Sequence, residues 1–494
     1  MSKRVAITQL PSGVPGLDDV LGGGLPEFSF NLIAGGPGSG KTTLAHQIMF
    51  AAADDGRPAL YITILGEPPL KMLRYQQQYS FFDETKIGKS IRFAHFGGEL
   101  LEHGIEAVLQ AILREVEQTN PKLVFVDSFR SVINRSLQSG ELELQSFVQR
   151  LSLHLTSWEA TTFLIGEYEE RETECNPIFT VADGIIWLSQ ATYRNSMVRK
   201  IQVVKMRGQG TIPGLHTMKI SDAGIRVYPR LPNPDRPKPR AFAPRVRRTI
   251  GVPKLDEMLG GGIPGGYSVL LVGPSGSGKT ILATQFIRAG IAQGERGVIA
   301  VFEKRPDEYL TTAHGAHELE QLVADGKLRM LYLRPLDLSV DETMEEIAAA
   351  VKDLGATRVV IDSLMGFELA LAPTFREDFR ESLYRMVGAL VDIGVTVVMT
   401  AELVDSYTEL RLSPHGISFL TDGIVLQRYV ELDGELRKVM VVAKMRGFDH
   451  SKELRLYDIR DGGIEIGDAL SDREDILVGR ARRRSPTDSG DTSS

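Results

Sequence analysis

Two stretches of the sequence combine glycines with a lysine and a threonine in the spacing G-x-x-x-x-G-K-[ST]. They run from Gly35 to Thr42 and from Gly273 to Thr280. Glycines let backbone N–H groups converge on phosphate oxygens, and a following helix N-terminus adds partial positive charge. One such match could be only a glycine-rich turn, but two after apolar runs predict two ATP sites. The residues expected to contact ATP are Gly36, Pro37, Gly38, Ser39, Gly40, Lys41, Thr42 and Thr43 in the first site, and Gly276, Ser277, Gly278, Lys279, Thr280 and Ile281 in the second.

The cationic and acidic residues around these loops have separate expected roles. Lys41 and Lys279 should reach the β- and γ-phosphates and act in catalysis, while the following threonine hydroxyls bind Mg²⁺. Asp127 and Asp362 each end an apolar run, where a metal-shell carboxylate is expected, although an aspartate there can also be only a turn former. The residues expected around Mg²⁺ are Thr42, Asp127, Thr280, Glu303 and Asp362.

The two loops belong to a tandem repeat that covers most of the chain. "GVPGLDDVLGGGLP", from Gly13, returns as "GVPKLDEMLGGGIP", from Gly251, and "KMRG" at 205–208 returns at 444–447. Chance matches do not keep their register over such a length, so the sequence is a duplication of one unit. Each copy can therefore be read against the other.

The copies differ at the residue expected to activate the nucleophile. Such a group should end the strand beside the phosphate-loop strand, and Glu303 ends the apolar run of the second copy there. Leu65 holds the matching position in the first copy, and a leucine can neither polarise water nor bind a metal. Glu67 would return a carboxylate only if the chain bulges at Gly66. We therefore expect catalysis in the second copy and ATP binding with weak or no hydrolysis in the first.

Both copies alternate short β-branched apolar runs with amphipathic stretches of helical spacing. This pattern predicts an α/β fold, with two tandem P-loop NTPase domains that each contain a mostly parallel sheet covered by helices. Later segments of each copy should form hairpin strands that extend the sheet. The expected domains are residues 1–228 and 249–478, joined by a proline-rich linker at 229–248 that suits neither helix nor sheet, and followed by a polar, disordered tail at 479–494.

Composition narrows the class of protein. The 494 residues carry a net charge of −7, which argues against a dedicated nucleic-acid coat. The single cysteine has no partner for an internal disulfide. The sequence has neither a membrane-spanning apolar run nor a signal-peptide pattern at its start, so we expect a cytoplasmic protein.

The duplicated plan, the "GxxxLDxxLGGGxP" entry before each loop and the "KMRG" near the end of each copy together resemble the KaiC family of RecA-like ring ATPases. The resemblance implies two tandem RecA-like domains per subunit and a homohexamer of stacked rings, with ATP and Mg²⁺ between neighbouring subunits. It further implies that one segment of each copy contacts the nucleotide of a neighbouring subunit. These residues are Lys205, Met206, Arg207, Gly208, Lys444, Met445, Arg446 and Gly447.

The resemblance also implies an autokinase. The family pattern has a tandem Glu-Glu after the strand, of which this chain keeps Glu303 in the second copy and neither residue in the first. The C-terminal ring of the family phosphorylates itself on a Ser and a Thr shortly before a "TD" pair. Here Ser418 takes the serine position, Phe419 replaces the threonine, and Ser413 is a second candidate. The expected activities are therefore ATPase and serine/threonine autokinase, used as a signalling or timing switch.

The family resemblance also implies partners, and two other functions are compatible with the same fold. A KaiB-like protein or a sensor kinase is the expected partner, whereas a KaiA-like activator is not expected because the C-terminal end is short. A RecA- or DnaB-like DNA motor shares the fold but needs basic and aromatic pore loops, and the candidate segments at 190–197 and 429–436 are mixed or acidic. A nucleotide-gated scaffold without productive catalysis is a further alternative, favoured in the first copy by Leu65.

Overall fold

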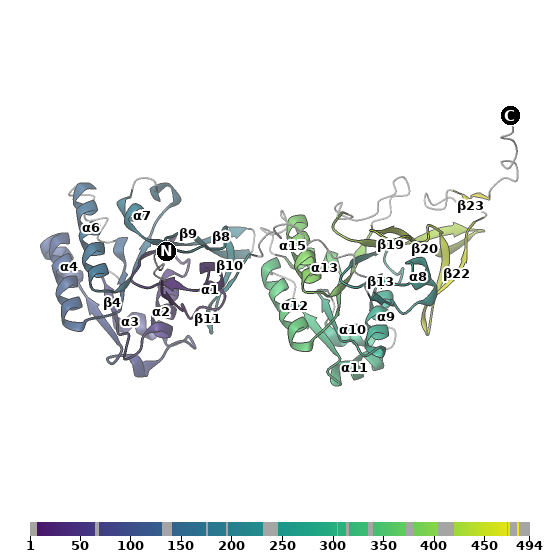
Figure 1. Cartoon of the computed structure of the whole chain (residues 1–494), viewed down its shortest axis with the longest axis horizontal. Coiled ribbons are helices and arrows are strands. Elements are labelled where there is room, and N and C mark those ends of the chain that lie inside the picture. The colour runs from purple at the N-terminus through teal and green to yellow at the C-terminus, as the bar shows by residue number, and fades with distance from the viewer. Residues whose placement is uncertain are drawn as a thin grey trace, which may run out of the picture. The chain divides into compact units, whose positions relative to one another are not determined.

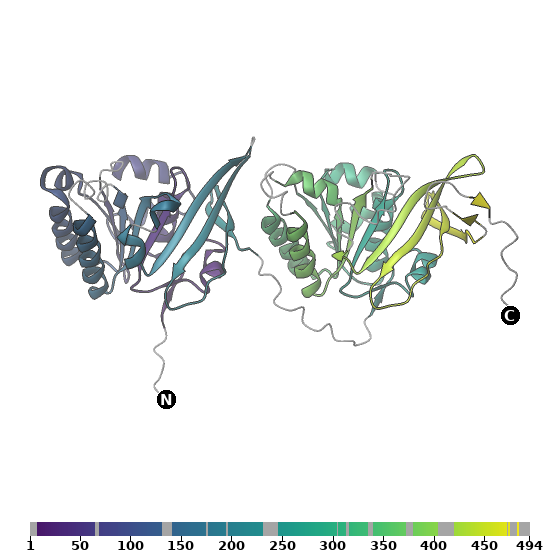
Figure 2. The same cartoon turned by 90° about the horizontal axis from the view of Figure 1, so that it is seen from above.

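The chain forms two compact units, Met1–Arg230 and Leu231–Ser494. The computed structural model describes residues 7–64, 69–130, 141–173, 176–193, 196–230, 246–303, 305–312, 316–333, 339–371, 379–403, 419–471, 473–474 and 482–483. Figures 1 and 2 show each unit as one sheet covered by helices.

The sheet of the first unit has nine strands in the order β11-β10-β9-β8-β3-β7-β6-β4-β5. The six strands from β8 to β5 in this order, which include the central strand β3, all run parallel. The hairpin strand β9 then turns back, and β10 and β11 continue the antiparallel extension. The strands are β3 (Phe30–Gly35), β4 (Ala59–Thr63), β5 (Ile91–His95), β6 (Leu123–Asp127), β7 (Thr161–Glu167), β8 (Gly184–Tyr193), β9 (Ser196–Met206), β10 (His216–Ser221) and β11 (Gly224–Tyr228), with β1 (Gln9–Leu10) paired to β2 (Leu25–Pro26).

The second unit repeats this topology with the sheet order β16-β15-β17-β18-β14-β19-β20-β21-β22. Its parallel strands again centre on the strand that precedes the phosphate loop, and a hairpin again extends the sheet. The strands are β14 (Ser268–Gly273), β15 (Gly297–Val301), β16 (Leu328–Tyr332), β17 (Arg358–Asp362), β18 (Thr396–Glu402), β19 (Gly423–Leu432), β20 (Glu435–Met445), β21 (Arg455–Arg460) and β22 (Gly463–Ala469), with the short pairs β12 (Arg247–Arg248) and β13 (Ile263–Pro264), and β23 (Arg473–Glu474) and β24 (Arg482–Arg483).

Helices bury both faces of each sheet. In the first unit they are α1 (Leu17–Leu21), α2 (Lys41–Ala52), α3 (Pro69–Gln76), α4 (Gly97–Thr119), α6 (Glu141–Ser157) and α7 (Pro177–Val181), with 3-10 turns at Glu84–Lys86 and Glu170–Thr173. In the second they are α8 (Pro253–Met258), α9 (Lys279–Ala292), α10 (Pro306–Thr312), α11 (Ala316–Ala324), α12 (Val340–Leu354), α13 (Leu364–Ala370) and α15 (Phe379–Asp392). Figure 1 shows α4 beside α6 and α12 beside α15, each pair against its own sheet.

Alternation along the strands explains why both faces are apolar. In β3, Leu32 joins the core under α4 and α6, while Ile33 joins the core under α2. Successive side chains of a strand point to opposite faces, so a strand covered on both sides must be apolar throughout. The two-faced parallel sheet predicted from the sequence is therefore confirmed, and so are the hairpin strands beyond it.

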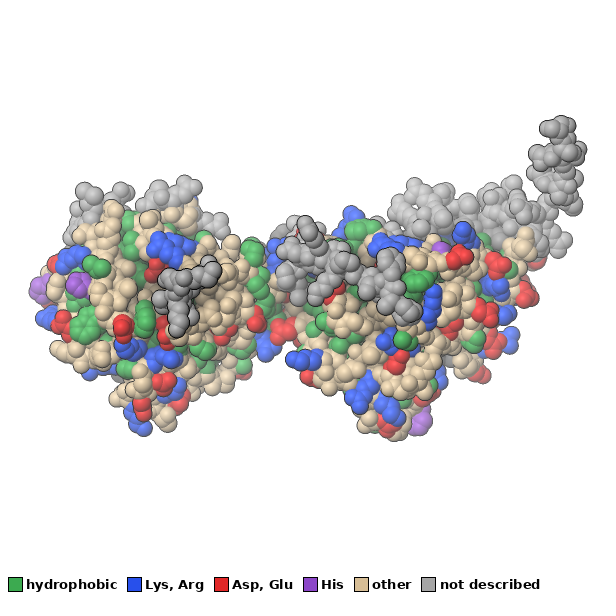
Figure 3. Space-filling view, in the orientation of Figure 1, with side chains coloured by type: hydrophobic (Ala, Val, Ile, Leu, Met, Phe, Trp, Pro, Cys, Tyr) green, Lys and Arg blue, Asp and Glu red, His purple; other side chains and the backbone are tan. Residues whose placement is uncertain are grey.

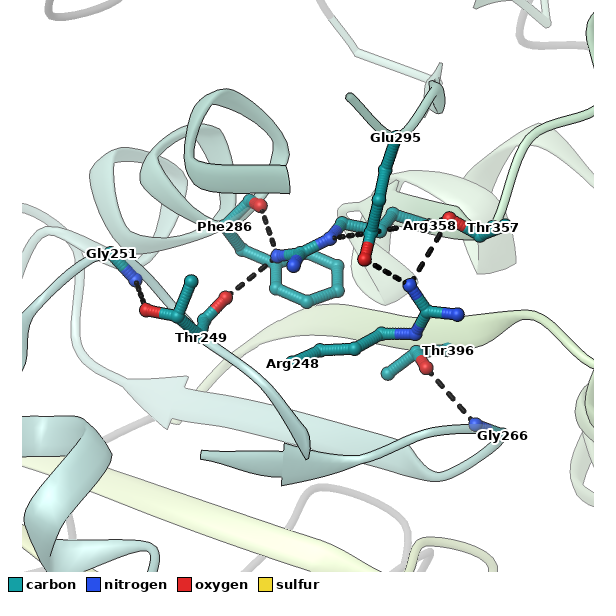
Figure 4. Close-up of polar contacts among 9 residues, drawn as sticks. All are labelled: Arg248, Thr249, Gly251, Gly266, Phe286, Glu295, Thr357, Arg358 and Thr396. Carbon is teal, nitrogen blue, oxygen red and sulfur yellow. Dashed lines mark hydrogen bonds and ion pairs between the residues drawn. The ribbon is translucent and has the colours of Figure 1, made fainter. Parts of the chain in front are cut away.

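A buried arginine ties the start of the second unit to its sheet (Figure 4). Arg358, at the start of β17, is 1% exposed and donates from Nη1 to the backbone oxygens of Thr249 and Phe286, at 2.6 and 2.7 Å. Its Nε donates to Oε2 of Glu295 at 2.5 Å, and Glu295 also forms an ion pair with Arg248. The chain is thereby anchored to the strand end as it enters this unit.

Candidate functional site

The phosphate loops join the central strand of each sheet to the helix that follows it. The first connects β3 to α2 and the second connects β14 to α9, so each helix begins at the loop lysine. Gly38 and Gly40 have φ of 69° and 103°, and Gly276 and Gly278 have φ of 76° and 95°. Side chains are strained at such angles, so glycine suits these turns. Each loop therefore leads directly into a helix N-terminus, which is the arrangement that binds phosphate.

Each loop lysine folds over its own loop. Nζ of Lys41 donates to the backbone oxygen of Gly36 at 2.7 Å, and Nζ of Lys279 donates to those of Gly273 and Pro274 at 2.8 and 2.7 Å. Burial lowers the pKa of both lysines, and neighbouring carboxylates oppose that shift. Both ammonium groups are therefore partly desolvated at their loops, where phosphate oxygens would add negative charge beside them.

The first-unit site is a cavity at the carboxyl ends of the parallel strands, where ligands bind in open α/β sheets. Its volume is about 510 Å³. It is lined by Gly38, Gly40, Lys41, Thr42, Thr43, Tyr79, Asp127, Ser128, Gly166, Glu167, Arg199 and Ile220. The fold thus brings together five of the residues expected to contact ATP, among them the expected magnesium ligand Thr42, and the second expected magnesium ligand of this unit, Asp127.

The aspartate in this cavity is held by two hydroxyl groups. Oδ2 of Asp127 accepts a hydrogen bond from Oγ1 of Thr42 at 2.9 Å and another from the Tyr61 hydroxyl at 2.8 Å. Burial raises the pKa of Asp127, and these hydrogen bonds oppose that rise. A threonine hydroxyl beside a carboxylate is an oxygen donor set of the kind that Mg²⁺ prefers.

The second unit holds its aspartate differently. Oδ1 of Asp362 accepts from Oγ1 of Thr400 at 2.5 Å, and Oδ2 accepts from the Tyr309 hydroxyl at 3.2 Å. No group of three or more His, Cys, Asp or Glu residues that could hold a metal occurs among the described residues.

Glu303 lies next to Asp362, the aspartate that the sequence predicts as a magnesium ligand in the second unit. The prediction that Glu303 follows the strand beside the phosphate-loop strand is wrong, because β17 and β18 lie between β15 and β14. The pairing of β15 with β17 puts Val301 opposite Asp362, and Oε1 of Glu303 accepts a hydrogen bond from Oγ of Ser363 at 2.6 Å. Glu303 is also among the carboxylates that raise the pKa of Lys279 against burial. Leu65, Gly66 and Glu67 lie outside the described residues, as do the candidate phosphosites Ser413 and Ser418.

Sequence reasoning missed one further carboxylate in each site. Glu167 ends β7 with Oε1 4.0 Å from Nζ of Lys41, and Glu402 ends β18 and raises the pKa of Lys279. The signal was available in the sequence, because "LIGE" and "MTAE" end with glutamate at matching places in the two copies. The first unit therefore has a carboxylate at its phosphate loop even though Leu65 replaces the expected glutamate.

The two "KMRG" segments lie at the other edge of their sheets. Gly184 pairs with both Asn31, near the start of β3, and Met206, whereas the phosphate loop follows the end of β3. Four residues of strand separate the two levels, which is roughly 13 Å at 3.3 Å per residue. In the second unit, Gly423 pairs with Val269 and Met445 in the same way. Each segment is therefore distant from the phosphate loop of its own unit.

The basic side chains of these segments contact nearby oxygens while part of each arginine remains exposed. Nη1 of Arg207 lies 3.0 Å from Oδ1 of Asp183, with 61% of the side chain exposed. Arg446 lies 3.7 Å from Asp422 and is 57% exposed. Nζ of Lys205 donates to the Thr180 backbone oxygen at 3.0 Å. Exposed guanidinium groups at this edge are accessible to another molecule.

A parallel sheet with a phosphate loop after its central strand, and an aspartate at the end of the next strand but one, defines a P-loop ATPase, present here as two RecA-like units. A profile of the family described as "ATPase: KaiC" matches residues 10–232 and 248–471. The chain therefore belongs to the KaiC ATPase family.

Curated relatives match over nearly the full chain. The circadian clock oscillator protein KaiC of Synechococcus elongatus is 26% identical over 98% of this chain and 93% of its own length. KaiC of Prochlorococcus marinus is also 26% identical, over 98% and 97%. The circadian clock protein KaiC3 of Synechocystis is 26% identical over 96% and 94%. Among the described residues, no helix is long and apolar enough to cross a membrane.

Proposed function

We propose that this chain is an ATP-driven switch whose second unit hydrolyses ATP and transfers the γ-phosphate to a serine of the chain itself. One observation carries the proposal: Glu303 is held by Ser363 at the strand end beside Asp362, close enough to influence Lys279. The first unit, with Leu65 in the matching position, binds ATP mainly for assembly. Its Glu167 allows slow hydrolysis at most.

The residues of the second unit divide the reaction between them. Lys279 holds the γ-phosphate, and Glu303 accepts the proton of the attacking hydroxyl or water. As the new bond to phosphorus forms, the bond to the β,γ-bridging oxygen breaks and ADP leaves. Thr280 and Asp362 would hold Mg²⁺, which neutralises charge on the phosphates when it is bound. Ser418 is the proposed acceptor, with Ser413 as the second candidate.

Assembly into a homohexamer with ATP between subunits is part of this proposal. Each "KMRG" segment lies far from the phosphate loop of its own unit, which is the placement expected if it serves a neighbour. The exposure of Arg207 and Arg446 supports the same reading. A guanidinium that reaches across an interface to a polyphosphate acts as an arginine finger. Head-to-tail contacts of this kind form a ring when the rotation between neighbouring subunits closes.

The relatives are named as circadian clock proteins, and we propose a signalling or timing role in the cytoplasm for this chain as well. A KaiB-like protein or a sensor kinase is the proposed reader. A nucleic-acid motor is less well supported, because Figure 3 shows acidic and basic side chains interspersed on the visible face of each unit. Grooves that bind single-stranded nucleic acid are usually lined with positively charged side chains.

Two measurements test the proposal. Steady-state ATP hydrolysis should disappear in Glu303→Gln and largely survive in Lys41→Ala; the reverse pattern would assign the chemistry to the first unit. After incubation with γ-labelled ATP, mass spectrometry should locate phosphate on Ser418, and Ser418→Ala should abolish labelling while Ser413→Ala keeps it. A Ser418→Ala protein that labels as strongly as the parent chain would show that the assigned acceptor is wrong.

A further inference from the structure

We propose that Tyr61 and Tyr309 are positioning residues that hold the magnesium-shell aspartates Asp127 and Asp362, and that each unit supplies this tyrosine from a different element. The inference rests on the proposed ATP- and Mg²⁺-binding function. Both tyrosine hydroxyls donate to Oδ2 of the aspartate in their unit, at 2.8 Å for Tyr61 and 3.2 Å for Tyr309. A buried tyrosine hydroxyl usually finds a hydrogen-bond partner, and in both units that partner is the same oxygen of the equivalent aspartate.

In the first unit the tyrosine comes from the sheet itself. Tyr61 is the middle residue of β4 and pairs with Phe125 of β6, while Asp127 lies two residues further along β6 on the same face. Diagonal neighbours on adjacent strands lie about 7–8 Å apart, within the reach of an aromatic side chain. The ring is fixed from two sides, with its centroid 5.9 Å from that of Phe125 and 4.5 Å from that of His46.

In the second unit the same strand position cannot provide a hydroxyl. The middle residue of β15 is Ile299, paired with Val360 of β17. Tyr309 instead comes from α10, the helix that follows this strand, and is 3% exposed. Thr284 of the phosphate-loop helix is hydrogen-bonded to it.

In the first copy, the helix position that corresponds to Tyr309 lacks a hydroxyl. Lys71 and Met72 occupy the corresponding turn of α3, and neither carries a hydroxyl. A tyrosine that only filled space would have no reason to return at a new position with the same hydrogen bond. Both units share a tyrosine hydroxyl that donates a hydrogen bond to the aspartate carboxylate. This points to a requirement for holding that carboxylate in the orientation that would bind the metal. Partners of this kind tune metal affinity through the ligand they hold.

The test measures Mg²⁺ affinity rather than turnover. Binding of a fluorescent ATP analogue to the full chain is titrated with Mg²⁺, using Tyr61→Phe in a Lys279→Ala background and Tyr309→Phe in a Lys41→Ala background. Phenylalanine keeps the ring packing and removes only the hydroxyl. The Mg²⁺ midpoint should rise about tenfold or more in each variant, the usual cost of losing such a partner. Binding in excess EDTA should stay at the level of the matching background.

Tyr168→Phe in the Lys279→Ala background is the matched control. Tyr168 is also buried in the first unit, and its hydroxyl has no hydrogen-bond partner among the described residues. Its loss should leave the Mg²⁺ midpoint unchanged. Unchanged midpoints in both Tyr61→Phe and Tyr309→Phe would overturn the inference while leaving the proposed function intact. If instead neither background binds the analogue with or without Mg²⁺, the proposed function fails and the inference with it.

Discussion

Oγ of Ser363 donates a hydrogen bond of 2.6 Å to Oε1 of Glu303. Ser363 directly follows Asp362 and also caps α13 by accepting from the backbone N–H of Gly366 at 3.1 Å. The residue proposed to activate the nucleophile is thus tied to the strand end that carries Asp362, the aspartate proposed to bind Mg²⁺. Because two neighbouring strands supply the two carboxylates, the sheet itself sets their separation.

Removing this hydroxyl should slow catalysis without preventing binding. Hydrogen bonds to charged groups contribute about 1.5–3 kcal/mol, so Ser363→Ala should lower the rate of ATP hydrolysis by roughly tenfold or more. ATP affinity should change little, since Ser363 is proposed to act through Glu303. Single-turnover hydrolysis and analogue binding would separate the two effects. Ser128→Ala, at the matching place in the first unit, should cost much less; equal losses in the two variants would contradict the positioning role.

The proposed action of Arg446 on a neighbouring subunit predicts complementation. Loss of an arginine finger costs about 10³-fold or more, so Arg446→Ala and Lys279→Ala should each be nearly inactive in hydrolysis by the second unit. When the two are mixed, an intact loop can meet an intact arginine across an interface. Random mixing in equal parts should restore about a quarter of the sites, given one productive pairing in four.

A mixture of Lys279→Ala with Glu303→Gln is the control for this experiment. Both changes affect the same pocket of one subunit, so no interface regains a complete site. Activity that stays absent in the Arg446→Ala mixture as well would argue against a contribution from the neighbouring subunit.

His46 should make the stability of the first unit sensitive to acid. It is fully buried beside Tyr61, and burial lowers its pKa from 6.5 to about 3. Between pH 6.5 and about 3, His46 binds a proton in the unfolded chain but not in the folded one. The stability that neutral His46 contributes is therefore complete above pH 6.5 and is lost as the pH falls. At pH 5 the loss is about 2 kcal/mol.

Urea unfolding at pH 7 and pH 5 would measure this effect. His46→Phe, which can join the surrounding aromatic side chains, should lose about 2 kcal/mol less between the two values than the parent chain does. An equal loss in both proteins would exclude His46 as its source.

The buried Arg358 should matter more for stability than exposed arginines do. Removing one partner of a buried ion pair costs about 3–5 kcal/mol, because the remaining charge stays buried. Glu295→Ala should therefore destabilise the second unit by at least about 3 kcal/mol in chemical denaturation. Arg329→Ala is the control: its pair with Asp353 is exposed and should contribute less than about 1 kcal/mol. Similar losses from the two changes would mean that Arg358 is well solvated.

Local patterns in the sequence were enough to predict the phosphate loops, the duplication and the α/β fold class. Each of these depends on neighbours along the chain: glycines at turn positions, a lysine at a helix start, and apolar runs of strand length. The difference between Glu303 and Leu65 was visible for the same reason, since the two copies can be aligned. The roles assigned to these residues, and to Ser418, stay predictions.

Tertiary structure alone decided which distant side chains meet at the site. Tyr309 replaces the function of Tyr61 from another element, and no sequence alignment pairs them, because what they share is the position of a hydroxyl in space. The glutamates that end β7 and β18 reach the loop lysines only because those strands lie beside the central strand. The placement of the "KMRG" segments at the opposite edge likewise follows from antiparallel strand direction. Sequence spacing therefore determined the phosphate loops, whereas strand order and direction determined what surrounds them.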